Sequence, residues 1–292
     1  MRGRGRFEKG FTIVELVVVI AISAILSLSV MQFISVPVEA YVDQSRRARL
    51  VEIAETAVER IGHDVHAALP NSLRVGCGGA CLEYLRTVAG GRYRASPPGD
   101  ELSFNPADAD ATFDVLGGLD LPAGLATSAD PDACRDGNAA CVVIYNTGYS
   151  GTDAWQRDNI ATLVGANASS VTFDNSRFSS GSAAFPATSP GQRFFIVDSP
   201  VSYLCDLGAG VLRRYQGYDI HAAQADVDSH AELLATANPA ESALLADRVS
   251  ACSFSYSPGT PTRNAMLTVR ITVSEAGESV NLLQQVGVLN GT

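Results

Sequence analysis

The chain has 292 residues and a net charge of −10. This acidic balance argues against a general nucleic-acid-binding protein, which needs a basic face for the phosphate backbone. About 220 residues follow the N-terminal helical region described below, which is enough for one sizeable core.

A short basic leader precedes a long apolar run. The run extends from Phe11 to about Val38, which is long enough to cross a bilayer because about 20 residues suffice. The leader, residues 1–10, has a net charge of +3, so the chain beginning at Phe11 would carry about −13. Positive charge before the run predicts a cytoplasmic N-terminus and an extracytoplasmic remainder. The basic residues of the leader are Arg2, Arg4, Arg6 and Lys9.

One carboxylate, Glu15, lies inside the apolar run. A charge at the bilayer centre costs at least roughly 2.5–3.5 kcal/mol, so an isolated carboxylate there indicates a function. We interpret Glu15 as a group that finds its partner in a neighbouring subunit. The alternative is an ordinary membrane anchor in which Glu15 extends to the membrane surface.

The stretch Gly10–Leu16, GFTIVEL, resembles the class III signal of type IV prepilins and type II secretion pseudopilins. The resemblance implies that prepilin peptidase, an enzyme of the membrane, cleaves after Gly10 and N-methylates Phe11. It also implies that Glu15, fifth in the mature chain, pairs with the α-amino group of Phe11 in a neighbour. The implied partners are other major and minor pilins, contacted through the N-terminal helix in the bacterial inner membrane.

The next segment has the pattern of an amphipathic helix. Its charged residues occupy the opposite face from the apolar ones, and Pro70 predicts that the helix ends at Leu69. We expect residues 11–38 to form the transmembrane and assembly helix and residues 39–70 to continue it along the body. His63 and His66 lie three residues apart, and exposed histidines explain them better than a metal pair does. The apolar positions are Leu50, Ala54, Ala57, Val58, Ile61, Val65 and Leu69.

Residues 71–292 are predicted to form an extracytoplasmic, β-rich globular domain. Short β-prone segments alternate with turns rich in Gly, Pro, Asn and Asp, and residues 267–273 and 280–288 have the pattern of a hairpin with one buried face. The Ala-rich residues 221–245 are expected to be partly helical. The fold class is therefore α+β, with a long N-terminal helix packed on an antiparallel sheet. The other predicted strands are 101–104, 112–116, 141–145, 170–173, 194–197, 201–207 and 252–256.

Segments near the end of the amphipathic helix, residues 69–75, 77–85 and 90–94, narrow the resemblance. They are similar to the minor pilin-like subgroup called mannose-sensitive haemagglutinin (MSHA) biogenesis protein MshO. That subgroup is itself similar to the J-type minor pseudopilins and the W-type minor pilins.

All six cysteines lie beyond the apolar run, on the predicted extracytoplasmic side, where an even number favours disulfides. Zinc is disfavoured because no CxxC occurs and the four histidines are not spaced with the cysteines. Six cysteines allow 15 connectivities. We favour local pairing: Cys77–Cys81, Cys134–Cys141 and Cys205–Cys252.

The sequence carries none of the common local motifs of catalysis or cofactor binding. No GxSxG, HExxH, P-loop or dinucleotide fingerprint occurs, and no local signature nominates a catalytic triad. We therefore predict no enzyme, no catalytic residue, no cofactor, no metal and no nucleic-acid partner. The oxygens of Asp130, Asp132, Asp136 and Asn138 suit calcium, but turn formation explains these residues more simply. Tyr145, Tyr149 and Trp155 suit contact with sugar or protein, although a core or loop role is favoured.

Together, these expectations predict a structural protein that takes part in filament assembly. It would be a minor pilin-like subunit that primes or caps an MSHA-type, type IV pilus-like filament, passing from the inner membrane to the periplasm and a cell-surface filament. The alternatives are a J-type minor pseudopilin of type II secretion and a filament-tip adhesin that binds a surface glycan or protein.

Overall fold

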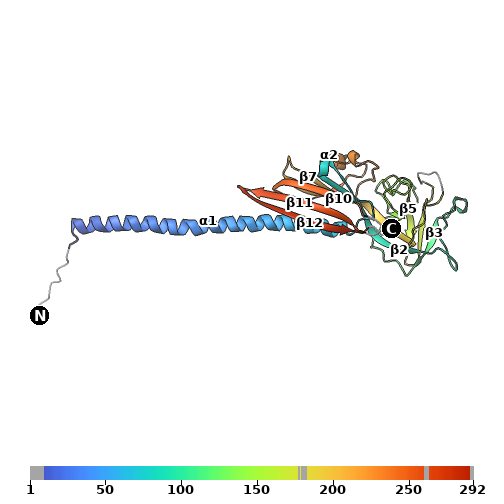
Figure 1. The fold of residues 1–292 in the computed structure, drawn as a ribbon, viewed down its shortest axis with the longest axis horizontal. Coiled ribbons are helices and arrows are strands. Elements are labelled where there is room, and N and C mark those ends of the chain that lie inside the picture. The colour runs from blue at the N-terminus through green and yellow to red at the C-terminus, as the bar shows by residue number, and fades with distance from the viewer. Residues whose placement is uncertain (1–9, 177, 179–182, 260–262, 290–292) are drawn as a thin grey trace, which may run out of the picture. The chain divides into compact units, whose positions relative to one another are not determined.

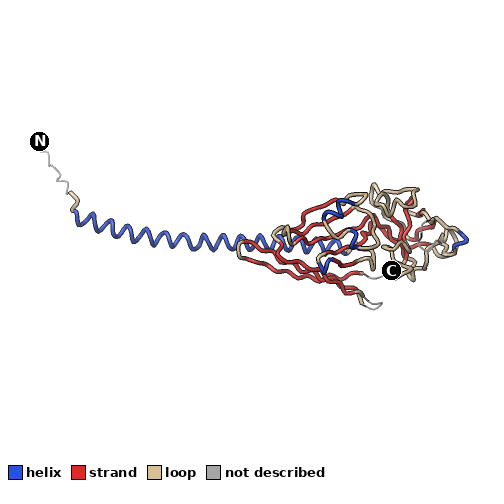
Figure 2. The backbone as a smooth tube through the Cα atoms, turned by 90° about the horizontal axis from the view of Figure 1, so that it is seen from above, coloured by secondary structure: helices blue, strands red, loops and turns tan. Residues whose placement is uncertain are grey.

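The computed structural model describes residues 10–176, 178, 183–259 and 263–289. The chain divides into two compact units, residues 1–49 and residues 50–292. Helix α1 (Ile13–Val65) begins in the first unit and ends in the second, which otherwise consists mainly of strands and loops (Figures 1 and 2). An apolar helix followed by antiparallel sheets confirms the predicted α+β class.

Within the second unit, the last turns of α1 contribute one face to a hydrophobic core. Six of the predicted apolar positions are buried there, and they share the core with residues of both sheets. The helix ends at Val65 rather than at the predicted Leu69. The reason is tertiary, because the backbone of Ala67 and Leu69 bonds to a strand instead: the Thr87 amide donates to the Ala67 carbonyl and the Leu69 amide to the Leu85 carbonyl.

Among the described residues, nine strands form the larger sheet, and every pairing in it is antiparallel. The order is β1-β2-β3-β6-β5-β4-β7-β8-β9, and β2 also pairs with β7. That extra pairing closes six strands, β2, β3, β6, β5, β4 and β7, into a ring. The strands are β1 (Arg74–Gly76), β2 (Cys81–Tyr93), β3 (Thr112–Leu116), β4 (Cys141–Ile144), β5 (Ile160–Ala166), β6 (Ser170–Phe173), β7 (Arg193–Asp206), β8 (Val211–Gln216) and β9 (Glu241–Ala246).

An aromatic cluster fills the ring. Phe113 lies with its ring centroid 5.0 Å from that of Phe194, in an edge-to-face arrangement. Phe173 and Phe185 are separated by 5.1 Å, and all four rings are buried. Large rings in such pairs provide both apolar burial and favourable ring geometry.

The second sheet has three strands in the order β10-β11-β12, which lie side by side in Figure 1. They are β10 (Val249–Ser257), β11 (Ala265–Glu275) and β12 (Glu278–Val288), so the hairpin predicted from alternation is present. Ala276 and Gly277 link β11 to β12, and both have positive φ, at 50° and 86°. A two-residue turn with this backbone suits the twist of a tight hairpin.

Of two further expectations about local structure, one was wrong and one was confirmed. Residues 101–104 form no strand, although Leu102 is buried and its amide donates to the Arg94 carbonyl. The Ala-rich region is partly helical, as expected: it contains η3 (Gln224–Asp226) and α2 (His230–Ala235), and β9 follows. Ser229 and Glu232 form a capping box at the start of α2. Two further 3₁₀ turns are η1 (Cys77–Gly79) and η2 (Pro106–Asp108).

The structure contains three disulfides, Cys77–Cys81, Cys134–Cys141 and Cys205–Cys252. The first two close short loops next to β2 and β4. The third joins β7 to β10, with 6.1 Å between the two Cα atoms, and so ties the larger sheet to the smaller one. Cross-links of this kind stabilise a fold mainly by restricting the unfolded chain.

Candidate functional site

The segment around the predicted cleavage position is exposed. Gly10 lies before the helix with open space where a Cβ would be, and the side chain of Phe11 is 74% exposed. Helix α1 begins after Thr12, whose hydroxyl accepts a hydrogen bond from the Glu15 amide at 3.3 Å. Thr12 therefore acts as the N-cap and satisfies an amide that would otherwise lack a partner.

Glu15 lies in the first turn of α1 and is exposed. Among the described residues, its carboxylate has no hydrogen bond or ion pair. A negative side chain in the first turn interacts favourably with the positive end of the helix dipole. Its position in the helix thus leaves the carboxylate available to an external cation.

The helix that follows presents apolar side chains on all sides. Residues Ile13–Met31 have a mean hydropathy of 2.7, and no part of this stretch is buried within the chain. By length and composition it is the one helix among the described residues that could cross a membrane. Ser27 and Ser29 fit within it because their hydroxyls donate to the carbonyls of Ser23 and Ile25, at 2.7 and 3.0 Å.

A buried polar network ties α1 to the larger sheet. Asp64, only 7% exposed, accepts hydrogen bonds from the Tyr203 hydroxyl at 2.7 Å and from Arg214 Nε at 2.6 Å. Its other oxygen lies 3.0 Å from Arg60 Nε. Burial alone raises the pKa of this carboxyl, but the two hydrogen bonds and the charges of Arg214 and Arg60 outweigh it, so the pKa of Asp64 is lowered.

The network extends across the sheet. Arg214 Nη1 donates to Gln216 Oε1 at 2.5 Å, and the same oxygen accepts a bond from Arg86. Arg86 in turn forms an ion pair with Asp198 of β7. Arg214 is thus paired with Asp64 and Arg86 with Asp198, which suits a structural role for the network.

A second enclosed ion pair joins β1 to β2. Glu83 is fully buried, and its carboxylate lies 2.7 Å from both Arg74 Nε and the Tyr218 hydroxyl. Burial raises the pKa of Glu83, and the opposing effects of Arg74 and Tyr218 only partly offset it. The Arg74 guanidinium also stacks on Trp155, 3.6 Å from the ring centroid. Trp155 is buried, as the favoured core interpretation expected.

The remaining candidates of the body occupy turns and surfaces. Asp130 and Asp132 form a turn in which the Asp132 amide bonds to the Asp130 carboxylate, and Asp132 pairs with Arg157 at 2.8 Å. Over the residues that the structure describes, no cluster of three His, Cys, Asp or Glu could hold a metal. Tyr149 is exposed, whereas Tyr145 is partly buried against the aromatic cluster.

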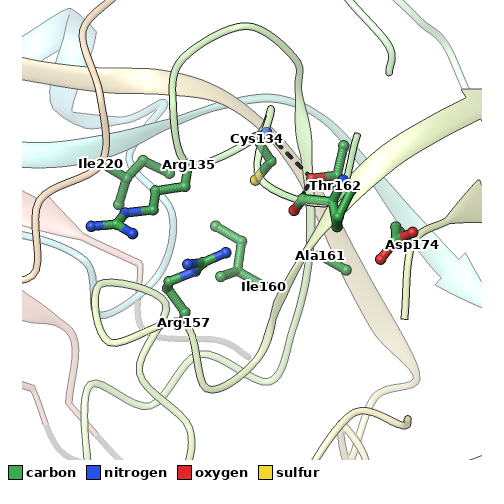
Figure 3. A pocket seen from close by; sticks show the side chains of 9 residues that line it. Cys134, Arg135, Arg157, Ile160, Ala161, Thr162, Asp174 and Ile220 are labelled. Carbon is green, nitrogen blue, oxygen red and sulfur yellow. Dashed lines mark hydrogen bonds between the residues drawn. The ribbon is translucent and has the colours of Figure 1, made fainter. Parts of the chain in front are cut away.

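Figure 3 shows a small hollow beside the Cys134–Cys141 disulfide. Its volume is about 10 Å³, which is about the space for one water molecule. Arg135 and Arg157 are among the residues that line it, and the Cys134 amide donates a hydrogen bond to the Thr162 hydroxyl (Figure 3). A hollow of this size does not fit an organic substrate.

Sequence reasoning nominated Gly10, Phe11 and Glu15, and the structure brings them together in one exposed segment. It missed Asp64 and Glu83, because each of them meets its arginine partner only in the folded protein. A signal for Asp64 did exist: it lies three residues after Ile61 and so falls within the apolar face of the helix. Glu83, inside the run Leu82–Leu85, interrupts an otherwise apolar strand in the same way.

Residues 5–31 match the family model of the prokaryotic N-terminal methylation motif. The match includes the Gly10–Phe11 junction, Glu15 and the whole stretch Ile13–Met31. A comparison with curated proteins and a comparison with solved structures each gave no significant match. The motif and the apolar helix support a pilin or pseudopilin subunit that is anchored in a membrane, and such subunits are structural.

Proposed function

We propose that this chain is a minor pilin-like subunit that primes or caps a type IV pilus-like filament of the MSHA type. The methylation motif over residues 5–31 is the observation that carries the proposal. The large body supports a place at the end of a filament, because bulk is easier to accommodate there than in a repeating shaft. The three disulfides suit an oxidising extracytoplasmic compartment.

In this proposal, residues 1–10 are a leader that prepilin peptidase removes in the inner membrane. Phe11 then becomes the methylated first residue, and residues 11–38 form the transmembrane and assembly helix. The exposed segment before α1 supports this, since a peptidase needs access to the Gly10–Phe11 bond. Residues 39–65 continue the helix and residues 66–70 connect it to the globular domain, residues 71–292, which would lie outside the cytoplasm.

Mass spectrometry of the protein purified from membranes tests the processing. The N-terminal peptide is expected to begin at Phe11 and to carry one added methyl group on its α-amino nitrogen. A protein that keeps residues 1–10 in cells with active prepilin peptidase would contradict the proposal.

Glu15 is proposed to dock each subunit onto its neighbour. Its carboxylate has no partner among the described residues, and the α-amino group of a neighbouring Phe11 would compensate its charge in the low-dielectric bilayer. Pairing of this kind also fixes the register between parallel helices.

Glu15→Gln tests the docking role, because it keeps the shape of the side chain and removes the charge. We expect processing to be unchanged and incorporation into filaments to fall by about tenfold or more, which corresponds to about 1.4 kcal/mol. The measurement is the ratio of filament-bound to membrane-bound protein on immunoblots. Glu39→Gln, a neutralisation of an exposed glutamate further along α1, is the control. Equal incorporation of both variants would contradict the pairing.

A further inference from the structure

Strand β2 has a gap along one edge. On its inner side it pairs with β7 from Cys81 to Arg92. On its outer side it meets β1 at residues 81–83, an isolated bridge between Ala68 and Arg86, and β3 at Arg92 and Tyr93. Between Thr87 and Arg92, no strand of the described chain covers the outer edge.

The gap leaves backbone hydrogen-bonding groups open. Val88 is the extra residue of a β-bulge, since Thr87 pairs with Val197 and Ala89 with Ile196. Beyond the bulge, the amide and carbonyl groups of successive residues point alternately to the inner and the outer edge of the strand. The Tyr93 amide donates inward to the Gln192 carbonyl, and the Arg94 amide donates outward to the Asp114 carbonyl. By this alternation, the amide and the carbonyl of Gly90 face the open edge. Such groups form a template for another strand.

A groove of about 650 Å³ lies along this gap. Apolar side chains provide much of its wall: Phe195 is partly buried, and Leu289 is 64% exposed. Gly90 leaves room beside the Phe195 ring, because a Cβ at this position would lie 3.3 Å from that ring. The residues that line the groove are His66, Ala67, Ala68, Pro70, Thr87, Val88, Ala89, Gly90, Gly91, Arg92, Arg193, Phe194, Phe195 and Leu289.

The charge of the groove is opposite in sign to that of the whole chain. His66, Arg92 and Arg193 line it and no acidic residue does, although the chain carries −10. Arg92 donates to the Gly191 carbonyl and to the Gln192 side chain, so its charge is not compensated by a carboxylate. Among the described residues, neither Arg92 nor Arg193 forms an ion pair. The groove therefore complements a ligand with negative charge.

We propose that this groove binds an extended acidic peptide segment of another protein chain. The segment adds to β2 as a short strand over residues 88–91, with main-chain bonds to Gly90. Four residues of strand span about 13 Å, so three or four residues of the ligand fit the gap. The main chain supplies affinity, and the two arginines select for acidic side chains.

Binding is tested with the full-length protein in detergent micelles and a fluorescein-labelled peptide, acetyl-Val-Glu-Val-Asp-Val-amide. We expect fluorescence anisotropy to show saturable binding. A peptide with Lys at both acidic positions is expected to bind about tenfold more weakly, the equivalent of about 1.4 kcal/mol. An acidic peptide of the same sequence with N-methylated backbone amides loses its main-chain hydrogen-bond donors. It is expected to bind at least as weakly as the Lys peptide. Equal binding of all three peptides, or no binding of the acidic one, would overturn the proposal.

The combined variant Arg92→Glu/Arg193→Glu reverses the charge of the groove at two exposed positions. We expect it to weaken binding of the acidic peptide by about tenfold, in line with two reversed surface ion pairs. Arg270→Glu changes an arginine on β11 that is also exposed, and it is expected to leave binding within about twofold. Loss of binding in both variants would indicate a general charge effect and would overturn the assignment to the groove.

A chain shortened to end at Leu289 distinguishes a partner from this chain's own last residues. We expect it to bind the acidic peptide as the full-length protein does. Much tighter binding by the shortened chain would show that residues 290–292 normally compete for the groove, which would contradict an external ligand.

Discussion

Asp64→Ala is expected to lower the free energy of unfolding of the body by about 3–5 kcal/mol, the usual cost of removing one partner of a buried ion pair. The loss is large because Arg214, itself 10% exposed in its side chain, would keep its charge without the carboxylate 2.6 Å away. The Tyr203 hydroxyl would lose its acceptor as well. Since Asp64 belongs to α1 and both partners belong to the larger sheet, the variant also loosens the packing of helix on sheet.

The measurement is denaturant unfolding of the full-length protein in detergent, followed by the fluorescence of Trp155, the single tryptophan of the chain. Asp247→Ala is the matched control, because it removes a carboxylate from a partly exposed ion pair with Arg248 and should cost at most about 1 kcal/mol. The double variant Asp64→Ala/Arg214→Leu removes both charges of the buried pair. It should recover part of the free energy of unfolding that Asp64→Ala alone loses. Equal stability of Asp64→Ala and Asp247→Ala would contradict the role of the network.

The Asp64 carboxylate also makes the difference in the free energy of unfolding between wild type and Asp64→Ala depend on pH. The pKa of Asp64 is lower in the folded protein than its ordinary value, so its ionised form is favoured by folding. This contribution is fully present above the unfolded pKa, near 3.9, and is lost as the pH falls through the folded pKa. We expect the stability difference to be constant from pH 5 to 7 and to shrink below about pH 4.

Gly10→Leu is expected to block processing, so that essentially all of the protein keeps residues 1–10. The proposed peptidase must bind the chain at this residue, and a bulky side chain next to the scissile bond would obstruct that binding. The fold itself offers no obstacle, because Gly10 precedes α1 and a Cβ there would meet open space. A block would therefore come from recognition by the enzyme and not from misfolding.

Intact mass of the membrane-extracted protein measures this effect. Gly3→Leu, which makes the same change within the leader but away from the scissile bond, is the control and should be processed normally. Normal processing of Gly10→Leu would contradict cleavage at this position. Unfolding of the variant's body should match that of wild type, which separates processing from stability.

The sequence predicted the elements whose patterns are local. The hairpin of β11 and β12 followed from alternation alone, because one of its faces packs against the core and the other faces solvent. Segment 112–116 was predicted with the bounds that β3 has. The end of α1 was misplaced because the backbone of Ala67 and Leu69 bonds to β2, a partner at least 16 residues away. Residues 101–104 alternate like a strand, yet they form no ladder.

The N-terminal residues alone determined the membrane helix and the methylation motif, because both depend on hydropathy and on spacing along the chain. Tertiary structure alone decided the closed ring of strands, the pairing of Asp64 with Arg214 and the open edge of β2 at Gly90. These features join residues far apart in the chain, such as Asp64 and Arg214. Their contact energies depend on burial and orientation, which no local pattern of residues encodes.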